Sequence, residues 1–167
     1  KALQLSQLMI GPNDNPNNAV TKKQLFNPRI GSFIYFQADV DKRNEYQRVA
    51  VEETRLGIPL LFAYDVIHGF RTVYPISIAQ ACSFNTNLVN EAARMAAAEA
   101  TASGLNWTFS PMVDVARDPR WGRVSEGYGE DPFVNSAFCV ATVKGYQGED
   151  LTAPDTLAAC LKHYVGT

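Results

Sequence analysis

The chain has 167 residues, of which 46% are hydrophobic and 19% are charged, and its net charge is −2. This is an ordinary globular composition. The sequence has no basic block, so nucleic acid is not an expected partner. It has no apolar run of ~20 residues, so no segment is expected to span a membrane. Cys82, Cys139 and Cys160 form no CxxC pair and no Cys/His metal spacing, so we expect no metal site and three small buried residues.

In chain order, the first segment is "ALQLSQLMI", residues 2–10, in which Leu5, Leu8 and Met9 have helical spacing. We therefore predict a helix there. After a polar loop, strand and helix patterns alternate. Buried strands are predicted over residues 29–36, 60–66, 105–111 and 156–165. Helices are predicted over residues 41–57, 85–104 and 132–148, the last with Asp131 as its N-cap.

The order of these elements predicts an α/β fold with a parallel sheet. The strand centres, near Phe33, Phe62, Thr108 and Cys160, are 29, 46 and 52 residues apart, which are the lengths of βαβ crossovers. Neither GxGxxG nor GxxxxGK[ST] is present. An open doubly wound sheet and part of a (β/α)8 barrel both fit. A complete barrel needs ~250 residues, so in that case the chain is completed by further polypeptide.

Polar residues follow the predicted strands at their carboxyl ends. Asp65 closes the second strand, a charged loop with Arg123 follows the third, and Lys162 and His163 close the fourth. Catalytic and binding groups of parallel α/β folds gather at this edge. A carboxylate that accepts hydroxyls beside lysine and arginine donors suits a sugar better than a phosphate, which Asp65 would repel. Two alternatives stay open: a salt bridge of Asp65 to Arg71 or Arg123, and a core role for His163.

The loop "RDPRWGRVSEGYGED", residues 117–131, is unusually charged and stiff. We expect it to carry the Arg123 guanidinium rigidly, with Pro119 and Trp121 as anchors. Arg120 is predicted to be structural. Glu126 is predicted either to support the site from behind or to form a plain salt bridge within the loop.

Three segments, "GIPLLFAYDVIHG", "PMVDVARDPRWGRVSEGYGEDP" and "LKHY", resemble in that order the N-terminal barrel domain of glycoside hydrolase family 3. This family comprises β-glucosidases and related exo-acting enzymes. The resemblance implies that residues 1–167 form about the first four βα units of a TIM (β/α)8 barrel. It also implies that Asp65, Arg123, Lys162 and His163 hold the terminal, non-reducing sugar of a β-glucoside.

The resemblance further implies a retaining mechanism without metal or cofactor, in which the nucleophile and the acid/base lie beyond Thr167. No residue of this chain, Glu126 and Asp114 included, is then predicted to be catalytic, and the chain alone is predicted to be inactive. A β-xylosidase, an N-acetyl-β-glucosaminidase and a non-catalytic sugar-binding homologue are the alternatives. The segment "KHYVGT" departs from the "KHFPGHG" loop of the glucosaminidases, which disfavours that subgroup, and a glucosidase is weakly favoured over a xylosidase. The resemblance implies a periplasmic or secreted location.

Overall fold

The computed structural model describes residues 6–10, 30–35 and 39–163. Two compact units make up the chain. The first comprises Lys1–Tyr64 and Ser103–Leu105, and the second comprises Asp65–Ala102 and Asn106–Thr167. Parallel strands alternate with helices along the described residues, which confirms the predicted α/β class.

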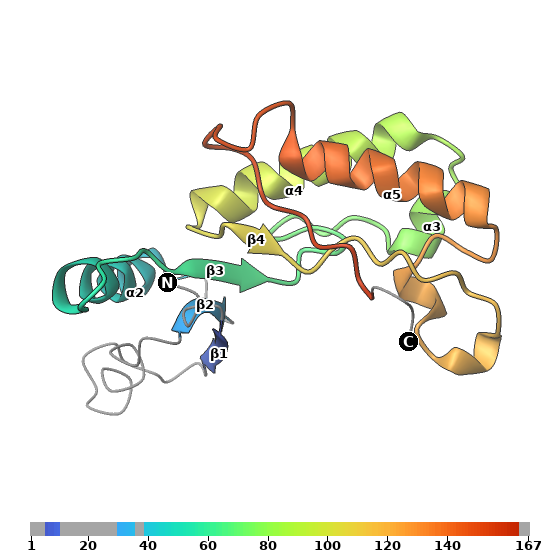
Figure 1. The fold of residues 1–167 in the computed structure, drawn as a ribbon. Coiled ribbons are helices and arrows are strands. Elements are labelled where there is room, and N and C mark those ends of the chain that lie inside the picture. The colour runs from blue at the N-terminus through green and yellow to red at the C-terminus, as the bar shows by residue number, and fades with distance from the viewer. Residues whose placement is uncertain (1–5, 11–29, 36–38, 164–167) are drawn as a thin grey trace. The chain divides into compact units, whose positions relative to one another are not determined.

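The first unit contains a parallel sheet of β1 (Ser6–Ile10), β2 (Ile30–Tyr35) and β3 (Leu61–Tyr64), seen at the blue to green end of the ribbon in Figure 1. β2 pairs with both neighbours, and Phe33 lies opposite Phe62 in the register. The ring of Phe33 is fully buried, and its centroid lies 5.6 Å from that of the Tyr46 ring and 5.8 Å from that of the Phe62 ring. These aromatic side chains form the core of the first unit.

Among the described residues of the first unit, the helix is α2 (Val40–Arg48), which continues into a π-helical turn, Val49–Glu53. Asp39 caps it, because its carboxylate accepts a hydrogen bond from the Lys42 N–H at 3.2 Å. The helical segment ends at Glu53, four residues before the end predicted from the sequence, and Gly57 lies in the following loop with a φ of +59° that suits glycine.

The helix predicted over residues 2–10 is wrong. Residues 6–10 are strand β1, in which Leu8 and Met9 pair with Phe33 and Ile34 of β2, and residues 2–5 lie outside the described residues. A short apolar segment fits either period, so its spacing alone cannot distinguish a helix from a strand. Backbone pairing with β2, a long-range contact, decides in favour of the strand.

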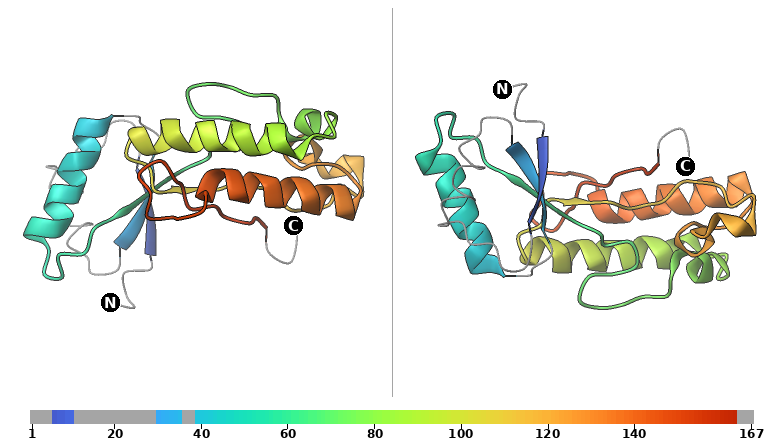
Figure 2. Two further views of the ribbon diagram at one scale, coloured as in Figure 1. Left: turned by 90° about the horizontal axis from the view of Figure 1, so that it is seen from above. Right: turned by 90° about the horizontal axis from the view of Figure 1, so that it is seen from below.

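The second unit contains two long helices, α4 (Thr86–Ala102) and α5 (Pro132–Gln147), which Figure 2 shows side by side. The predicted N-cap is confirmed: the Asp131 carboxylate accepts the Val134 N–H at 2.9 Å, and Pro132 is the first helical residue. On α4, small side chains face the interior, since Ala93, Ala96, Ala97 and Ala100 are buried. These small residues let the backbones of the two helices approach closely.

Gly145 on α5 lies at the closest approach of these helices. A Cβ at this position would be 2.7 Å from the Cβ of Ala93 and would overlap the Asn90 carbonyl oxygen. We therefore predict that Gly145→Ala lowers the free energy of unfolding by roughly 1–3 kcal/mol, because overpacking outweighs the better helix propensity of alanine. Denaturant unfolding measures this, with the exposed neighbour Lys144→Ala as the control. A Gly145→Ala protein as stable as the wild type would contradict this packing.

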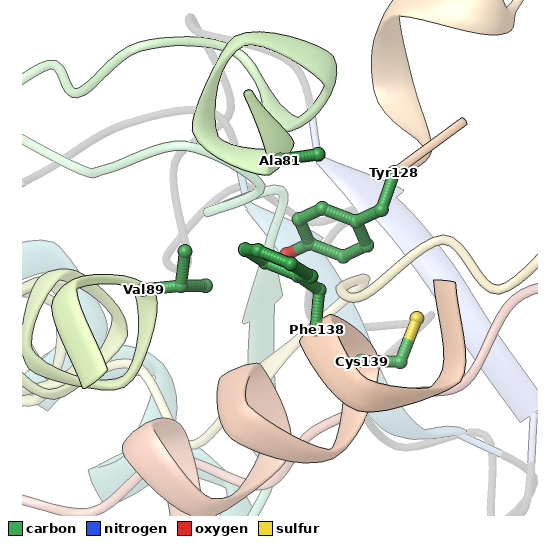
Figure 3. Packing of buried hydrophobic residues seen from close by; sticks show 5 residues of the cluster. All are labelled: Ala81, Val89, Tyr128, Phe138 and Cys139. Atoms are coloured by element: carbon green, nitrogen blue, oxygen red, sulfur yellow. The ribbon is translucent and has the colours of Figure 1, made fainter. Parts of the chain in front are cut away.

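Figure 3 shows the core cluster that joins α3 (Ser77–Ala81) to the two long helices. Tyr128, from the charged loop, stacks on Phe138 of α5 with ring centroids 5.5 Å apart. Its hydroxyl lies 2.6 Å from the Thr142 Oγ1, and burial raises the pKa of Tyr128 to about 12. Tyr128 thereby anchors the end of the charged loop in the core. The cluster comprises Ala81, Val89, Tyr128, Phe138 and Cys139.

The three cysteines do not share one environment, which corrects the expectation that all are buried. Cys139 is buried, and burial raises the pKa of its thiol to about 12. Cys160 is half-buried and Cys82 is exposed, and all three are free. The location of Cys82 in the turn after α3 brings its side chain to the surface.

Residues 106–111 of the third predicted strand and 156–163 of the fourth lie side by side in the second unit, but as extended segments with little regular ladder; residues 164 and 165 lie outside the described residues. Strand β4 covers only Trp107–Thr108. Isolated parallel bridges join Trp107 to Ala158 and Met112 to Lys162. Pro111 lacks an N–H and interrupts the ladder, although its carbonyl accepts the Lys162 N–H at 3.1 Å. This parallel pairing brings residues 113–114 beside 162–163.

Candidate functional site

Asp65 is held by the backbone that follows it. The Val66 N–H donates to the Thr108 Oγ1 at 3.1 Å, and the Val66 carbonyl accepts from the Tyr146 hydroxyl at 2.6 Å. Tyr146 is buried on α5, and burial raises its pKa, so the phenol stays a neutral donor. Contacts of the adjacent backbone with β4 and α5 therefore help to set the position of Asp65.

Asp65 and Lys162 form an ion pair across 97 residues of sequence, with Nζ and Oδ2 3.1 Å apart. The Asp65 side chain is half exposed, at 49%, whereas that of Lys162 is 13% exposed. Of the partners that the sequence analysis considered, Arg123 acts on Asp65 only as a longer-range charge. The carboxylate thus keeps open acceptor sites beside a nearly buried ammonium.

Arg123 lies between two short 3-10 turns of the charged loop, Pro119–Trp121 and Val124–Glu126. Its Nε and Nη2 each donate to one carboxylate oxygen of Glu126, both at 2.7 Å. This bidentate pair raises the pKa of Arg123 and lowers the pKa of Glu126. Glu126 is therefore the loop's ion-pair partner of Arg123, and it orients the guanidinium.

His163 joins Arg123 to Asp114. The Arg123 Nη1 lies 3.2 Å from the Nε2 of His163, and the His163 Nδ1 lies 2.8 Å from the Asp114 Oδ2. The same carboxylate oxygen accepts the His163 backbone N–H at 3.0 Å. His163 is 32% exposed in its side chain, so it borders the site instead of filling the core.

The sequence analysis did not assign a role to Asp114, although its side chain is only 7% exposed. A signal was present, because "PMVDVA" places one carboxylate in an apolar segment, as "LLFAYDV" does for Asp65. The sequence does not reveal the pairing of residues 112 and 162, and this pairing brings Asp114 to His163.

Arg120, which was predicted to be structural, pairs with a neighbour in the same loop. Its guanidinium pairs with Asp118 at 2.6 Å, and its side chain is 89% exposed. Asp118 also accepts the Arg120 N–H at 2.9 Å and so caps the first 3-10 turn. Gly122 then follows with φ +88°, a left-handed conformation that glycine allows, and the chain continues to Arg123.

Because the hydrogen bonds from Arg123 lower the pKa of Glu126, we predict that the contribution of Glu126 to stability depends on pH. Since its pKa in the folded protein lies below the ordinary value of 4.5, the pair stabilises the fold above that pH and this stabilisation is lost on acidification. Glu126→Gln should lower stability by about 1 kcal/mol or less at neutral pH, because the pair is partly exposed. The difference from wild type should shrink as the pH falls below 4.5 and should vanish once Glu126 is protonated in the folded protein.

Thermal unfolding of both proteins across this pH range measures the effect, with Glu130→Gln as a control on an exposed carboxylate of the same loop. A difference that stays constant with pH would show that the carboxylate charge of Glu126 contributes nothing.

Among the described residues, no three His, Cys, Asp or Glu side chains are grouped so that they could hold a metal ion. In the same part of the chain, none of the helices combines the length and apolarity needed to cross a bilayer. What the site offers is a half-exposed carboxylate, a lysine ammonium and a guanidinium with N–H groups to spare. This mixture of acceptors and donors fits a ligand that carries several hydroxyl groups.

Residues 1–167 match the family described as "Glycosyl hydrolase family 3 N terminal domain". The chain is 42% identical to the "Periplasmic beta-glucosidase" of Salmonella typhimurium over 161 residues, which cover 96% of this chain and 21% of that protein. It is 34% identical to a "Beta-xylosidase" of Formosa agariphila, over 90% of this chain and 23% of that protein. Among solved structures, the β-glucosidase from Listeria innocua in complex with glucose matches with a TM-score of 0.82 and 41% identity, over 97% of this chain and 24% of the other.

The chain therefore belongs to glycosyl hydrolase family 3 and corresponds to the N-terminal domain of that family. It spans between a fifth and a quarter of the length of these relatives.

Proposed function

We propose that the polypeptide containing this chain is a retaining, exo-acting β-glucosidase that removes terminal, non-reducing β-D-glucosyl residues. The single observation that carries the proposal is the cluster of Asp65, Lys162, His163 and Arg123 within the second unit, linked pairwise at 3.1 Å and 3.2 Å. In this proposal the four side chains bind the hydroxyl groups of the terminal glucose. The relatives named as β-glucosidases support the choice of sugar.

The chemistry of the four residues suits this role. The Asp65 carboxylate can accept two hydroxyl donors, because the pair with Lys162 does not occupy all its lone pairs. Lys162 and Arg123 donate to hydroxyl oxygens. Hydrogen bonds to charged groups are each worth roughly 1.5–3 kcal/mol, so a few of them fix the orientation of one pyranose.

We propose that residues 1–167 are the first part of a (β/α)8 barrel domain and that the rest of the polypeptide completes it. The catalytic nucleophile and the acid/base are proposed to lie beyond Thr167, in the barrel and in a following domain. Two carboxyl groups ~5 Å apart would then carry out the double displacement that retains the anomeric configuration. The 167-residue chain by itself is expected to be inactive, since it supplies sugar contacts but no nucleophile.

The second candidate is a β-xylosidase, which the Formosa agariphila relative favours. Xylose differs from glucose in lacking the hydroxymethyl group. The four residues named here do not distinguish the two sugars, so the choice between the two activities requires a comparison of substrates. A periplasmic or secreted location is proposed from the name of the Salmonella typhimurium relative.

The test is hydrolysis of chromogenic β-glucoside, β-xyloside and N-acetyl-β-glucosaminide by the whole polypeptide, with the product anomer followed by NMR. The expected result is fastest turnover of the glucoside, with the β-anomer released first. Preference for the xyloside would select the second candidate. A well-folded protein that binds glucose but hydrolyses none of the three glycosides would indicate a non-catalytic sugar-binding homologue. Hydrolysis by purified residues 1–167 alone would refute the placement of the nucleophile.

A further inference from the structure

We propose that Asp114 is a positioning residue that holds His163 with its proton on Nδ1, so that Nε2 accepts a hydrogen bond from Arg123. The proposal concerns the same sugar site and rests on the function proposed above. The sugar contacts assigned from the family do not include Asp114, which acts here through His163.

The two neighbours of His163 specify its tautomer. An ionised Asp114 can only accept, so the contact of 2.8 Å requires a proton on Nδ1. Arg123 can only donate, so its contact of 3.2 Å requires a bare Nε2. The other neutral tautomer would place two acceptors together at one end of the ring and two donors together at the other. A doubly protonated ring would face the guanidinium with a like charge.

Asp114 also fixes the orientation of the ring. Its Oδ2 accepts from the His163 backbone N–H at 3.0 Å as well as from Nδ1. One oxygen therefore ties the main chain and the side chain of His163 together. Because the Asp114 side chain is 7% exposed, water competes little for these bonds. The Asn135 Nδ2 donates to the backbone carbonyls of Val113 and Asp114, which holds this segment against α5.

The consequence for the site lies in the N–H groups of Arg123. A guanidinium has five N–H groups. Glu126 takes one on Nε and one on Nη2, and His163 takes one on Nη1. One N–H on each Nη is left, and the described residues give no bond for either. Glu126 and His163 together hold the guanidinium from two edges and leave a pair of donors for a sugar hydroxyl.

Without Asp114 the imidazole can rotate or move its proton to Nε2. The donor on Nε2 would then oppose the Arg123 Nη1, and the guanidinium would lose its contact on that edge. The expected effect is on the alignment of Arg123, and through it on sugar binding in the transition state.

The experiment uses the whole polypeptide and compares Asp114→Ala with Asp114→Asn. The amide oxygen of Asn can replace Oδ2 and accept both bonds, whereas Ala removes both. We expect Asp114→Ala to lower kcat/KM on a β-glucoside roughly tenfold and Asp114→Asn to restore most of that loss. In a His163→Ala background, Asp114→Ala should cost less than twofold more. Equal losses in both backgrounds would show that Asp114 does not act through His163 and would overturn the proposal.

A neutron crystal structure of the wild-type polypeptide tests the tautomer without any variant and without activity. Deuterium on Nδ1 of His163 and none on Nε2 is the expected result. Deuterium on Nε2 would overturn the proposal. If the wild type shows the expected tautomer but hydrolyses no glycoside, the proposed function falls and the hydrogen-bond assignment stands, so the two failures are distinguishable.

Discussion

Asp65→Asn should lower kcat/KM of the whole polypeptide on a β-glucoside by roughly 10- to 100-fold, the range given by the loss of one charge-assisted hydrogen bond. The side chain keeps its size, but one acceptor oxygen becomes an amino group. The neutral asparagine side chain also no longer balances the charge of Lys162, whose Nζ lies 3.1 Å from the Asp65 Oδ2 in the wild type. Because hydroxyl contacts of this kind strengthen as charge develops on the sugar, kcat should fall as well as KM rise.

The matched control is Asp155→Asn. Asp155 is exposed to a similar degree, 51% against 49%, and its ion pair with Arg94 is long, at 3.9 Å. Exposed pairs of this kind contribute about 1 kcal/mol at most, so its kinetics should match the wild type. Steady-state kinetics of both variants are the measurement. Asp65→Asn with wild-type kinetics would remove Asp65 from the sugar site.

Arg123→Lys should be nearly as damaging, although the charge is preserved. Arg123 spans Glu126 with two hydrogen bonds of 2.7 Å and reaches His163 with a third. A lysine ammonium is a single point donor and cannot make the bidentate contact while reaching His163 and a substrate. We expect a loss of roughly 10- to 100-fold in kcat/KM.

Arg120→Lys provides the comparison on the same loop. Arg120 pairs with Asp118 but is 89% exposed, so the lysine should change kcat/KM less than twofold. Thermal unfolding of both variants checks that the fold is kept. If Arg123→Lys and Arg120→Lys behave alike, the guanidinium of Arg123 has no special role in binding.

Local sequence patterns were sufficient for those elements whose signals lie within a few residues. Asp131 and Pro132 mark the start of α5 because an N-cap bond reaches only three residues ahead, to Val134. The alanine-rich α4 and the buried strand β2 follow equally local patterns. The sequence pattern did not identify β1, since a segment of five residues is too short to show a period and only its pairing with β2 makes it a strand.

The site divides in the same way. The sequence by itself determined which residue types stand at the carboxyl ends of the strands, and it singled out Asp65, Arg123, Lys162 and His163. Tertiary structure alone decided the partners: Lys162 for Asp65, 97 residues away, and Asp114 for His163, 49 residues away. The physical reason is that these bonds depend on parallel pairing between distant segments, which brings residues 112 and 162 side by side and which no local spacing encodes.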